Sequence, residues 1–359
     1  MLMFKVLQLF QIADDVDEVE RYGRGFINRT YFAKGKSNDY ILQMMDCSLC
    51  GKPEKSIDNT ILICKHLASK HTDSNQFVDL YTSDGERFIK LQNTIWHGFS
   101  IPKNKKLFKR VINVNMMEEI GKALGFFHRS MLDFPGEKLY CIDPELHDFQ
   151  NQYERMMIAS STDPHQRSLM AFNETKFIND RHETFFTIDK LIEQKKIPLR
   201  IAHNNIRLNN ILFKEENYQY FAIIGYDLVG IGTILYDLGE TIRHLVSTAR
   251  EDDLYFEAIK IELDYFRAFI KGYFKEMNSF LTIAEEENIV EAARIMVLEE
   301  AMRYVTDFLE NDITYKPQYH HQNLDRAKNQ IQLVKDIEKN YVIMNDIVRS
   351  AKQEALEKK

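Results

Sequence analysis

The stretch His203-Asn204-Asn205-Ile206-Arg207-Leu208-Asn209-Asn210, followed shortly by Ile223-Ile224-Gly225-Tyr226-Asp227, decides how this sequence is interpreted. Its apolar flanks predict a short β-hairpin over residues 201–226, inside a region whose pattern is otherwise helical. Asp227 lies two residues beyond Gly225, so on a strand both would point to one face, about 6.5 Å apart. A polar loop and a strand that carries an aspartate are therefore the first candidates for a functional site.

The spacing in this hairpin is that of a phosphoryl-transfer site, where a loop H-x-D-x-K-x-x-N precedes a strand with a metal-binding Asp. Asn205 occupies the position of the catalytic base, and Gly225 occupies the position of the metal ligand. An asparagine hydrogen-bonds a hydroxyl but accepts no proton near neutral pH, and such a base contributes about 10²–10⁴ in rate. The sequence thus has the frame of a phosphotransferase without its two central carboxylates.

The composition is that of an ordinary globular protein. The chain has 359 residues, 44% of them hydrophobic and 28% charged, which is enough for two domains or a two-lobed enzyme. A net charge of −7 gives a nucleic-acid partner no electrostatic support. No apolar run approaches the roughly 18 residues of a membrane span, and the N-terminus has no signal-peptide pattern, so we expect no membrane association and a cytoplasmic location.

Four cysteines are compatible with a reducing compartment. Cys47 and Cys50 form a C-x-x-C pair, but no second pair or histidines with matching spacing accompany it, so chance is favoured over a zinc site.

The first hundred residues predict strands and one helix. Alternating or apolar runs indicate strands at 24–33, 40–45, 77–81 and 88–91, and helical spacing is found over 53–69. Beyond residue 98 the patterns become helical, over these ranges: 111–132, 166–194, 235–248, 252–278, 285–309 and 323–355. We therefore predict an α+β, protein-kinase-like fold with two lobes, a small β-rich lobe over residues 1–98 and a large helical lobe over 99–359.

An ordered series of motifs resembles the aminoglycoside phosphotransferase and choline kinase-like superfamily, and within it most closely the N-acetylhexosamine 1-kinases. The segments that carry the resemblance run over nearly the whole chain: Gly25-Phe26-Ile27-Asn28-Arg29-Thr30-Tyr31, Tyr40-Ile41-Leu42-Gln43, Pro53-Glu54-Lys55, Pro198-Leu199-Arg200, Leu235-Tyr236-Asp237-Leu238-Gly239, Arg303-Tyr304-Val305-Thr306-Asp307 and Asn323-Leu324-Asp325-Arg326-Ala327. The resemblance implies ATP and Mg²⁺ as cofactors if activity is retained; no cofactor is otherwise predicted.

The resemblance also assigns roles in the hairpin. Asn205 replaces the base, Arg207 stands at the catalytic-loop Lys position, and His203 orders the loop. Asn210 stands at the second metal-binding position. Asp227 is interpreted either as a ligand of one ion in a shifted place or as a hydrogen-bonded loop residue.

The small lobe departs from the family at the nucleotide site. Met44 replaces a basic residue that holds nucleotide phosphates, and Asp58 replaces the helix Glu that pairs with it. Gly23 and Gly25 are interpreted equally well as phosphate-binding or as plain turn glycines.

Four further residues fall in segments that resemble those around the family's sugar pocket: Asn28, His147, Arg303 and Asp307. Arg and Asp suit sugar hydroxyls and an acetamido oxygen. Because Arg303 and Asp307 are spaced i, i+4, a helix-surface ion pair is the alternative.

We interpret the chain as a pseudokinase related to N-acetylhexosamine 1-kinases, which binds a sugar, a nucleotide or a protein partner without efficient phosphoryl transfer. The alternative is an active phosphotransferase, from ATP to the hydroxyl of an amino sugar or a similar molecule, with displaced catalytic groups such as Asp227. A third hypothesis, different chemistry on the same frame, rests only on the adaptability of folds.

Overall fold

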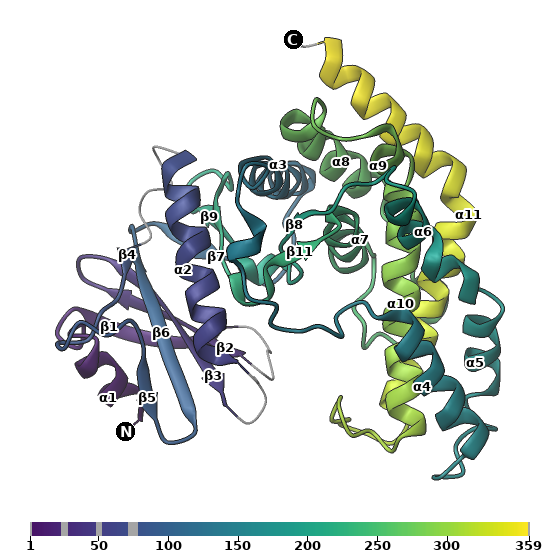
Figure 1. Ribbon diagram of the computed structural model, residues 1–359, viewed down its shortest axis with the longest axis horizontal. Helices are drawn as coiled ribbons and strands as arrows, with labels where there is room; N and C mark the ends of the chain where they lie inside the picture. Colours follow the sequence, from purple (N-terminus) through teal and green to yellow (C-terminus); the bar gives the residue numbers. More distant parts are fainter. Residues whose placement is uncertain (1, 23–27, 48–51, 71–77, 358–359) are drawn as a thin grey trace. The chain divides into compact units, whose positions relative to one another are not determined.

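The computed structural model describes residues 2–22, 28–47, 52–70 and 78–357. The chain divides into two compact units, drawn in Figure 1: unit 1 contains residues 1–142 and 203–231, and unit 2 contains residues 143–202 and 232–359. The chain passes between the units next to two short strands, β8 (Arg200–Ala202) and β11 (Gly230–Gly232).

Unit 1 is built on an antiparallel sheet with the order β1-β2-β3-β6-β4, in which β5 also pairs with β6. Its strands are β1 (Val16–Tyr22), β2 (Asn28–Gly35), β3 (Asp39–Asp46), β4 (Val78–Asp79), β5 (Ile89–Leu91) and β6 (Thr94–Ile101). The central strand β3 is buried along almost its whole length, because helices cover both faces of the sheet.

The two faces of β3 pack against different helices. Leu42 and Met44 pack with Trp96 and with α1 (Leu2–Leu9) in one apolar cluster. Met45 lies on the opposite face and packs with α2 (Pro53–Lys70). This division follows from the period of two along a strand, and Figure 1 shows α2 crossing the sheet.

A second, smaller sheet lies in the same unit, with the order β10-β9-β7. Its strands are β7 (Lys105–Leu107), β9 (Ile211–Lys214) and β10 (Tyr220–Ile223), and α3 (Val114–Ser130) packs against β10. One apolar cluster joins the two sheets, with Ile41 and Phe99 from the first and Leu212 and Ala222 from the second. Short 3-10 helices complete the unit: η1 (Gly136–Lys138), η3 (Leu208–Asn210) and η4 (Tyr226–Leu228).

Unit 2 is helical, and α10 (Ile289–Leu309) lies at its centre, buried on nearly every side. The elements that pack against it are α4 (Phe149–Thr162), α5 (Phe172–Asn179), η2 (His182–Phe186), α7 (Ile234–Leu245), α9 (Ile283–Glu287) and α11 (Gln322–Glu357). Of the other elements, η5 (Phe256–Ala258) and α8 (Leu263–Met277) pack against α11, and α6 (Thr187–Glu193) packs against η2. The long α11 runs beside α10 (Figure 1). At the start of α9, Thr282 and Glu285 form a reciprocal capping box, which satisfies two backbone N–H groups.

The predicted fold class is confirmed: a small sheet-based lobe accompanies a large helical lobe. The predicted helix over 166–194 is wrong, because the segment breaks into α5, η2 and α6. The helix predicted from residue 252 begins only at Leu263. The pattern analysis did not identify α1, β1, β6 or α4. The lobe boundary between residues 98 and 99 stays a prediction.

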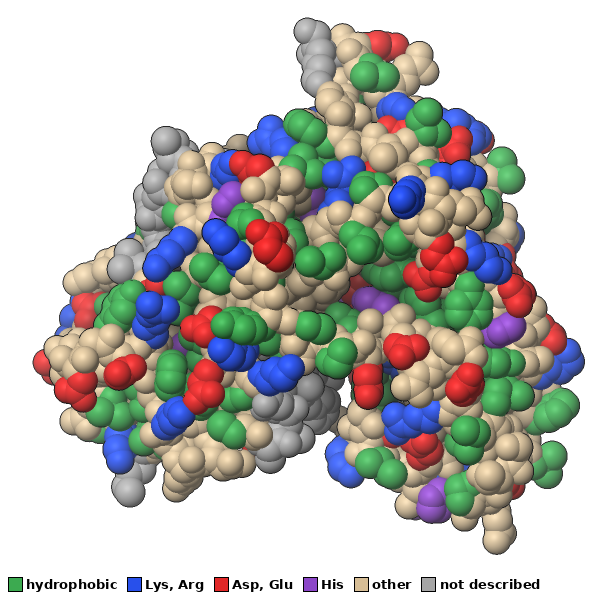
Figure 2. Space-filling model, viewed as in Figure 1, with side chains coloured by type: hydrophobic (Ala, Val, Ile, Leu, Met, Phe, Trp, Pro, Cys, Tyr) green, Lys and Arg blue, Asp and Glu red, His purple; other side chains and the backbone are tan. Residues whose placement is uncertain are grey.

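The surface carries acidic and basic side chains in mixture. Figure 2 shows both signs interspersed over the face in view, without an extended field of one sign. Within the described ranges, no helix has the length and apolar character required to cross a membrane.

Close packing of α7 on α10 generates a first prediction. A Cβ at Gly239 would lie 2.5 Å from the Ala292 carbonyl oxygen and 2.6 Å from Met296 Cγ. Gly→Ala inside a helix normally stabilises by about 1 kcal/mol. We expect Gly239→Ala instead to lower the free energy of unfolding by about 1–3 kcal/mol, because α7 must move off the α10 backbone. Urea denaturation measures this, and a stabilised variant would contradict the close approach.

Candidate functional site

The polar loop of unit 1 is organised by His203, which is completely buried. Its Nδ1 accepts the Asn205 backbone N–H at 3.3 Å, so the proton lies on Nε2, which faces the Ile224 carbonyl oxygen at 3.2 Å. The Phe127 ring packs edge-on against the imidazole, with 5.3 Å between centroids. His203 therefore joins the start of the loop to the end of β10 and has an ordering role.

The loop meets the segment after β10 through Asn205 and Asp227. The Asn205 Nδ2 donates to Asp227 Oδ2 at 3.3 Å. The Asp227 backbone carbonyl accepts the Ser56 hydroxyl of α2 at 3.1 Å, and Asp227 itself is buried in η4. The residue at the base position thus acts as a hydrogen-bond donor to a carboxylate, which is a role that an aspartate could not perform while ionised.

Gly225 has no room for a side chain. Its φ of 81° lies in the left-handed region, and a Cβ would lie 2.8 Å from both Cγ and Nδ2 of Asn210. The Asn210 amide is turned toward its own loop, where Nδ2 donates to the Asn205 carbonyl oxygen at 2.7 Å. A carboxylate at position 225 would therefore require both a different backbone and a different Asn210.

The sheet residues next to this loop differ from the expectation for the nucleotide site. Met44 is buried in the apolar cluster that faces α1, so its side chain lies on the face opposite α2. Its neighbour Gln43 lies on the α2 face and is paired across the sheet with His97 of β6. The geometry therefore favours Gln43 over Met44 as the strand residue that would face a ligand.

Gln43 and His97 are both more than nine-tenths buried. Among the residues that the structure describes, neither Gln43 Oε1 nor His97 Nε2 has a hydrogen-bond partner. Burial lowers the pKa of His97 to about 4, against the opposing effect of the Asp227 carboxylate. A signal for these residues was present in the sequence, since each is a polar side chain within an apolar strand.

The remaining candidates of unit 1 are more peripheral. Arg207 is exposed at the edge of the loop, and Asp58 is half-buried on α2. Asn28 begins β2, where its backbone pairs with Met45; its side chain lies outside the described residues, as do Gly23 and Gly25.

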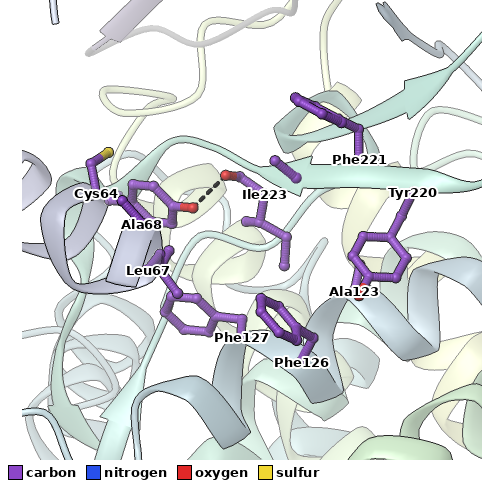
Figure 3. A pocket seen from close by; sticks show the side chains of 11 residues that line it. Cys64, Leu67, Ala68, Ala123, Phe126, Phe127, Tyr220, Phe221 and Ile223 are labelled. Carbon is purple, nitrogen blue, oxygen red and sulfur yellow. Dashed lines mark hydrogen bonds between the residues drawn. The ribbon is translucent and has the colours of Figure 1, made fainter. Parts of the chain in front are cut away.

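An apolar cavity lies beside the loop segment, lined by side chains from α2, α3 and β10 (Figure 3). The Tyr226 hydroxyl donates to the Ile223 carbonyl oxygen, and its ring stacks on Phe127 with 5.9 Å between centroids. Burial raises the pKa of the Cys64 thiol on the cavity wall to about 12, so that thiol stays protonated. The cavity wall therefore supplies packing for Tyr226.

In unit 2 the buried Glu299 contacts two of the predicted ligand residues, His147 and Arg303. Its Oε2 contacts His147 Nδ1 at 2.8 Å, and its Oε1 accepts from Arg303 Nη2 at 2.7 Å and from Gln152 Nε2 at 3.1 Å. Although burial opposes ionisation, the two cations lower the pKa of Glu299 to about 2. The pKa of His147 is raised: burial favours the neutral ring, but the Glu299 carboxylate outweighs it. Arg303 thus pairs with a residue four positions earlier, and sequence reasoning missed Glu299 and Gln152.

Asp307 belongs to a different structure. Its two oxygens accept from the backbone N–H groups of Thr314 and Tyr315 at 2.7 and 2.9 Å, and from Asn323 Nδ2 at 3.0 Å. Because these donors hold the turn between α10 and α11, Asp307 has a structural role. The expectation of a ligand-binding carboxylate here is not supported by its hydrogen bonds.

The site residues therefore form two groups. Asn205, Asn210 and Asp227 come together in unit 1, and His147 and Arg303 come together in unit 2. The convergence of both groups on one cleft stays a prediction. Within the described part of the chain, no cluster of three His, Cys, Asp or Glu side chains is arranged to hold a metal ion.

Comparison with solved structures identifies the fold. A microcompartment-associated aminopropanol kinase is 14% identical with a TM-score of 0.65, over 96% of this chain and 98% of that protein. Spectinomycin phosphotransferase, in complex with ADP and spectinomycin, is 13% identical with a TM-score of 0.57, over 93% and 98%. Choline kinase from Cryptosporidium parvum is 10% identical with a TM-score of 0.55, over 95% and 96%. No family model matches the sequence. The chain therefore has the kinase-like fold of aminoglycoside phosphotransferases and choline kinases.

The close approach of Gly225 to Asn210 predicts that Gly225→Ala destabilises the protein. A non-glycine residue at this φ costs about 1–3 kcal/mol, and crowding against Asn210 adds to that cost. Gly85→Ala is the matched control, since Gly85 has a φ of 80° but no atom near its Cβ position. Urea denaturation should show a larger loss for Gly225→Ala than for Gly85→Ala. Equal losses would contradict the crowding, and Asn210→Ala should remove the excess.

The Glu299–His147 pair predicts a pH dependence of stability. The folded pKa of Glu299 is lowered from 4.5 to about 2, so its contribution is present above about pH 4.5 and is lost as the pH falls toward 2. The folded pKa of His147 is raised above 6.5, so its contribution is complete below pH 6.5 and is lost as the pH rises through the folded value.

We expect Glu299→Gln to lose most stability between pH 4.5 and 6.5, by about 3–5 kcal/mol, because it leaves buried cations unpaired. Melting temperatures of both proteins from pH 3 to 9 give the difference. A difference that does not vary with pH would contradict the pairing.

Proposed function

We propose that this protein is a pseudokinase related to N-acetylhexosamine 1-kinases, which binds a small ligand on a phosphotransferase fold without efficient phosphoryl transfer. The observation that carries the proposal is the packing of Asn210 against Gly225. The space that a metal-binding carboxylate would need at position 225 is taken by an amide that hydrogen-bonds the loop. The absence of a metal-binding carboxylate at position 225 therefore depends on the local backbone and on Asn210, in addition to the residue at 225 itself.

The residue at the base position supports the same conclusion. The Asn205 amide donates to Asp227, so the loop stabilises a carboxylate at 227 rather than presenting one at 205. An amide takes no proton from an acceptor hydroxyl near neutral pH, and the missing base costs about 10²–10⁴ in rate.

The residues do not fit a Mg²⁺–nucleotide site of the usual kind. Such a site uses carboxylates on the ion and a cation on the phosphates. Here position 225 has no side chain, and the ligand-facing residues on the strands are the neutral Gln43 and His97. The Asp227 carboxylate adds a negative charge next to Asn205 and His97, which disfavours phosphate.

The alternative is an active phosphotransferase in which Asp227 replaces the missing carboxylates. The hydrogen bond between Asn205 and Asp227 favours this alternative, because it brings the Asp227 carboxylate next to the position of the catalytic base. Asp227→Asn would then abolish turnover, whereas in a pseudokinase there is no turnover to lose.

The polar cluster of unit 2 suggests the ligand class. The cluster contains hydrogen-bond donors and acceptors, and charged groups of both signs, from Glu299, Arg303, His147 and Gln152. Such a set suits the hydroxyl and amino or acetamido groups of an amino sugar. An amino alcohol has the same chemistry in a smaller molecule, and an aminopropanol kinase is among the proteins of similar fold.

Two measurements test the proposal. A coupled assay with ATP, Mg²⁺ and N-acetylglucosamine, N-acetylgalactosamine, their parent amino sugars or aminopropanol should show no ligand-dependent ATP consumption. Turnover near the 1–100 s⁻¹ of kinases would overturn the pseudokinase assignment. Thermal shifts with the same compounds should show binding, since a ligand of the folded state raises the melting temperature.

The ligand site is tested by a matched pair of variants. Arg303→Lys retains the charge but not the guanidinium geometry, and we expect a smaller thermal shift with the bound compound. Arg155→Lys is the control, because Arg155 forms an exposed ion pair with Glu310 in the same unit. Equal shifts in both variants would exclude Arg303 from the site.

A further inference from the structure

Two buried side chains that carry hydrogen-bond acceptors project from the α2 face of the large sheet in unit 1. Gln43 of β3 and His97 of β6 are direct cross-strand partners, so their side chains project from the same face. Gln43 is 3% exposed and His97 is 4% exposed. Over the described ranges, Gln43 Oε1 and His97 Nε2 have no protein donor. Leaving a buried polar atom unsatisfied costs about 1–3 kcal/mol, so two on adjacent strands indicate a missing partner.

A carboxylate lies near the same place. Asp227 lies in η4, which packs against α2, and α2 also covers the face of the sheet that carries Gln43 and His97. The Asp227 carboxylate raises the pKa of the His97 ring against the larger, opposite effect of burial. Asp227 is held in position by the Ser56 hydroxyl of α2 and by the amide of Asn205. The elements that surround this space are therefore fixed by contacts that do not involve Gln43 or His97.

The chemistry of these groups selects the missing partner. An amide oxygen, a neutral imidazole nitrogen and a carboxylate are all lone-pair donors, and together they carry one negative charge. A phosphate or another anion would be repelled by Asp227, whereas a cation would satisfy all three groups. Imidazole among the ligands favours Mn²⁺, Co²⁺ or Zn²⁺ over Mg²⁺, which prefers oxygen ligands and retains its waters.

We propose that Gln43 Oε1, His97 Nε2 and the Asp227 carboxylate form a binding site for one divalent transition-metal ion. The site joins β3 and β6 to the segment after β10, and of the two positions that the sequence suggested for a metal, Asn210 and Asp227, it uses Asp227. One of its three ligands is the amide oxygen of Gln43, so the site is not made of His, Cys, Asp and Glu side chains alone. The inference does not depend on whether the protein transfers phosphoryl groups.

The test uses the full chain, freed of metal with EDTA and dialysed. Titration with Mn²⁺, followed by the electron paramagnetic resonance signal of the free ion, should show one bound ion per chain. Mn²⁺ and Co²⁺ should raise the melting temperature more than Mg²⁺ at equal concentration. We expect Gln43→Leu, His97→Phe and Asp227→Asn each to weaken Mn²⁺ binding by about 10-fold or more. His182→Gln removes a partly buried histidine beside Glu183 in unit 2 and should bind as the parent does.

A second readout keeps the proposal falsifiable if a variant binds poorly for structural reasons. Without metal, Gln43→Leu and His97→Phe should melt at or above the parent temperature, because each removes an unsatisfied buried atom. Destabilisation of both metal-free variants would mean that ordered water already satisfies these atoms, and it would overturn the metal site. Equal Mn²⁺ affinity in parent and variants would overturn it as well. Metal binding without ATP turnover would support this inference and leave the pseudokinase assignment intact.

Discussion

Unit 1 depends on the position of Asp227. Its side chain accepts from Asn205 of the polar loop, its backbone carbonyl accepts from Ser56 of α2, and its charge acts on His97 of β6. A buried carboxylate is stable only when its surroundings supply donors or charge. The loop, the helix and the sheet are therefore constrained together, and a change in one of them requires a change in the others.

The residues around Asp227 are consistent with one another in this respect. With glycine at position 225, the chain takes a left-handed conformation and Asn210 fills the adjacent space. With asparagine at position 205, the loop donates to a carboxylate that an aspartate there would repel. Gln43 and His97 on the strands are uncharged, so the negative charge of Asp227 favours a cation over a phosphate. These contacts connect the polar loop, α2 and the segment after β10 through Asp227.

Unit 2 also contains a buried charged residue, Glu299. Glu299 is buried in the central helix α10 and keeps its charge because His147 and Arg303 contact it. Removing one member would leave a charge in a low-dielectric interior, which is far more costly than the net value of the pair. The same arrangement places donors and acceptors close together, which is what a ligand rich in hydroxyl or amino groups needs. Asp307, two turns further along α10, fixes the path of the chain into α11.

The sequence by itself determined the fold class, because strand and helix periods are local, and it determined the position of the hairpin that carries Asn205 and Gly225. It also identified α2 and α11 almost to the residue, since their apolar spacing is continuous. Only the tertiary structure decided which face of β3 meets α2, and thus that Gln43 rather than Met44 lies on the α2 face. That choice depends on strand pairing and on α1, which lie far apart in the sequence. The partners of Arg303 and Asp307 were decided in the same way: spacing on a helix shows which side chains are neighbours, whereas Glu299, His147 and Asn323 enter through packing between helices.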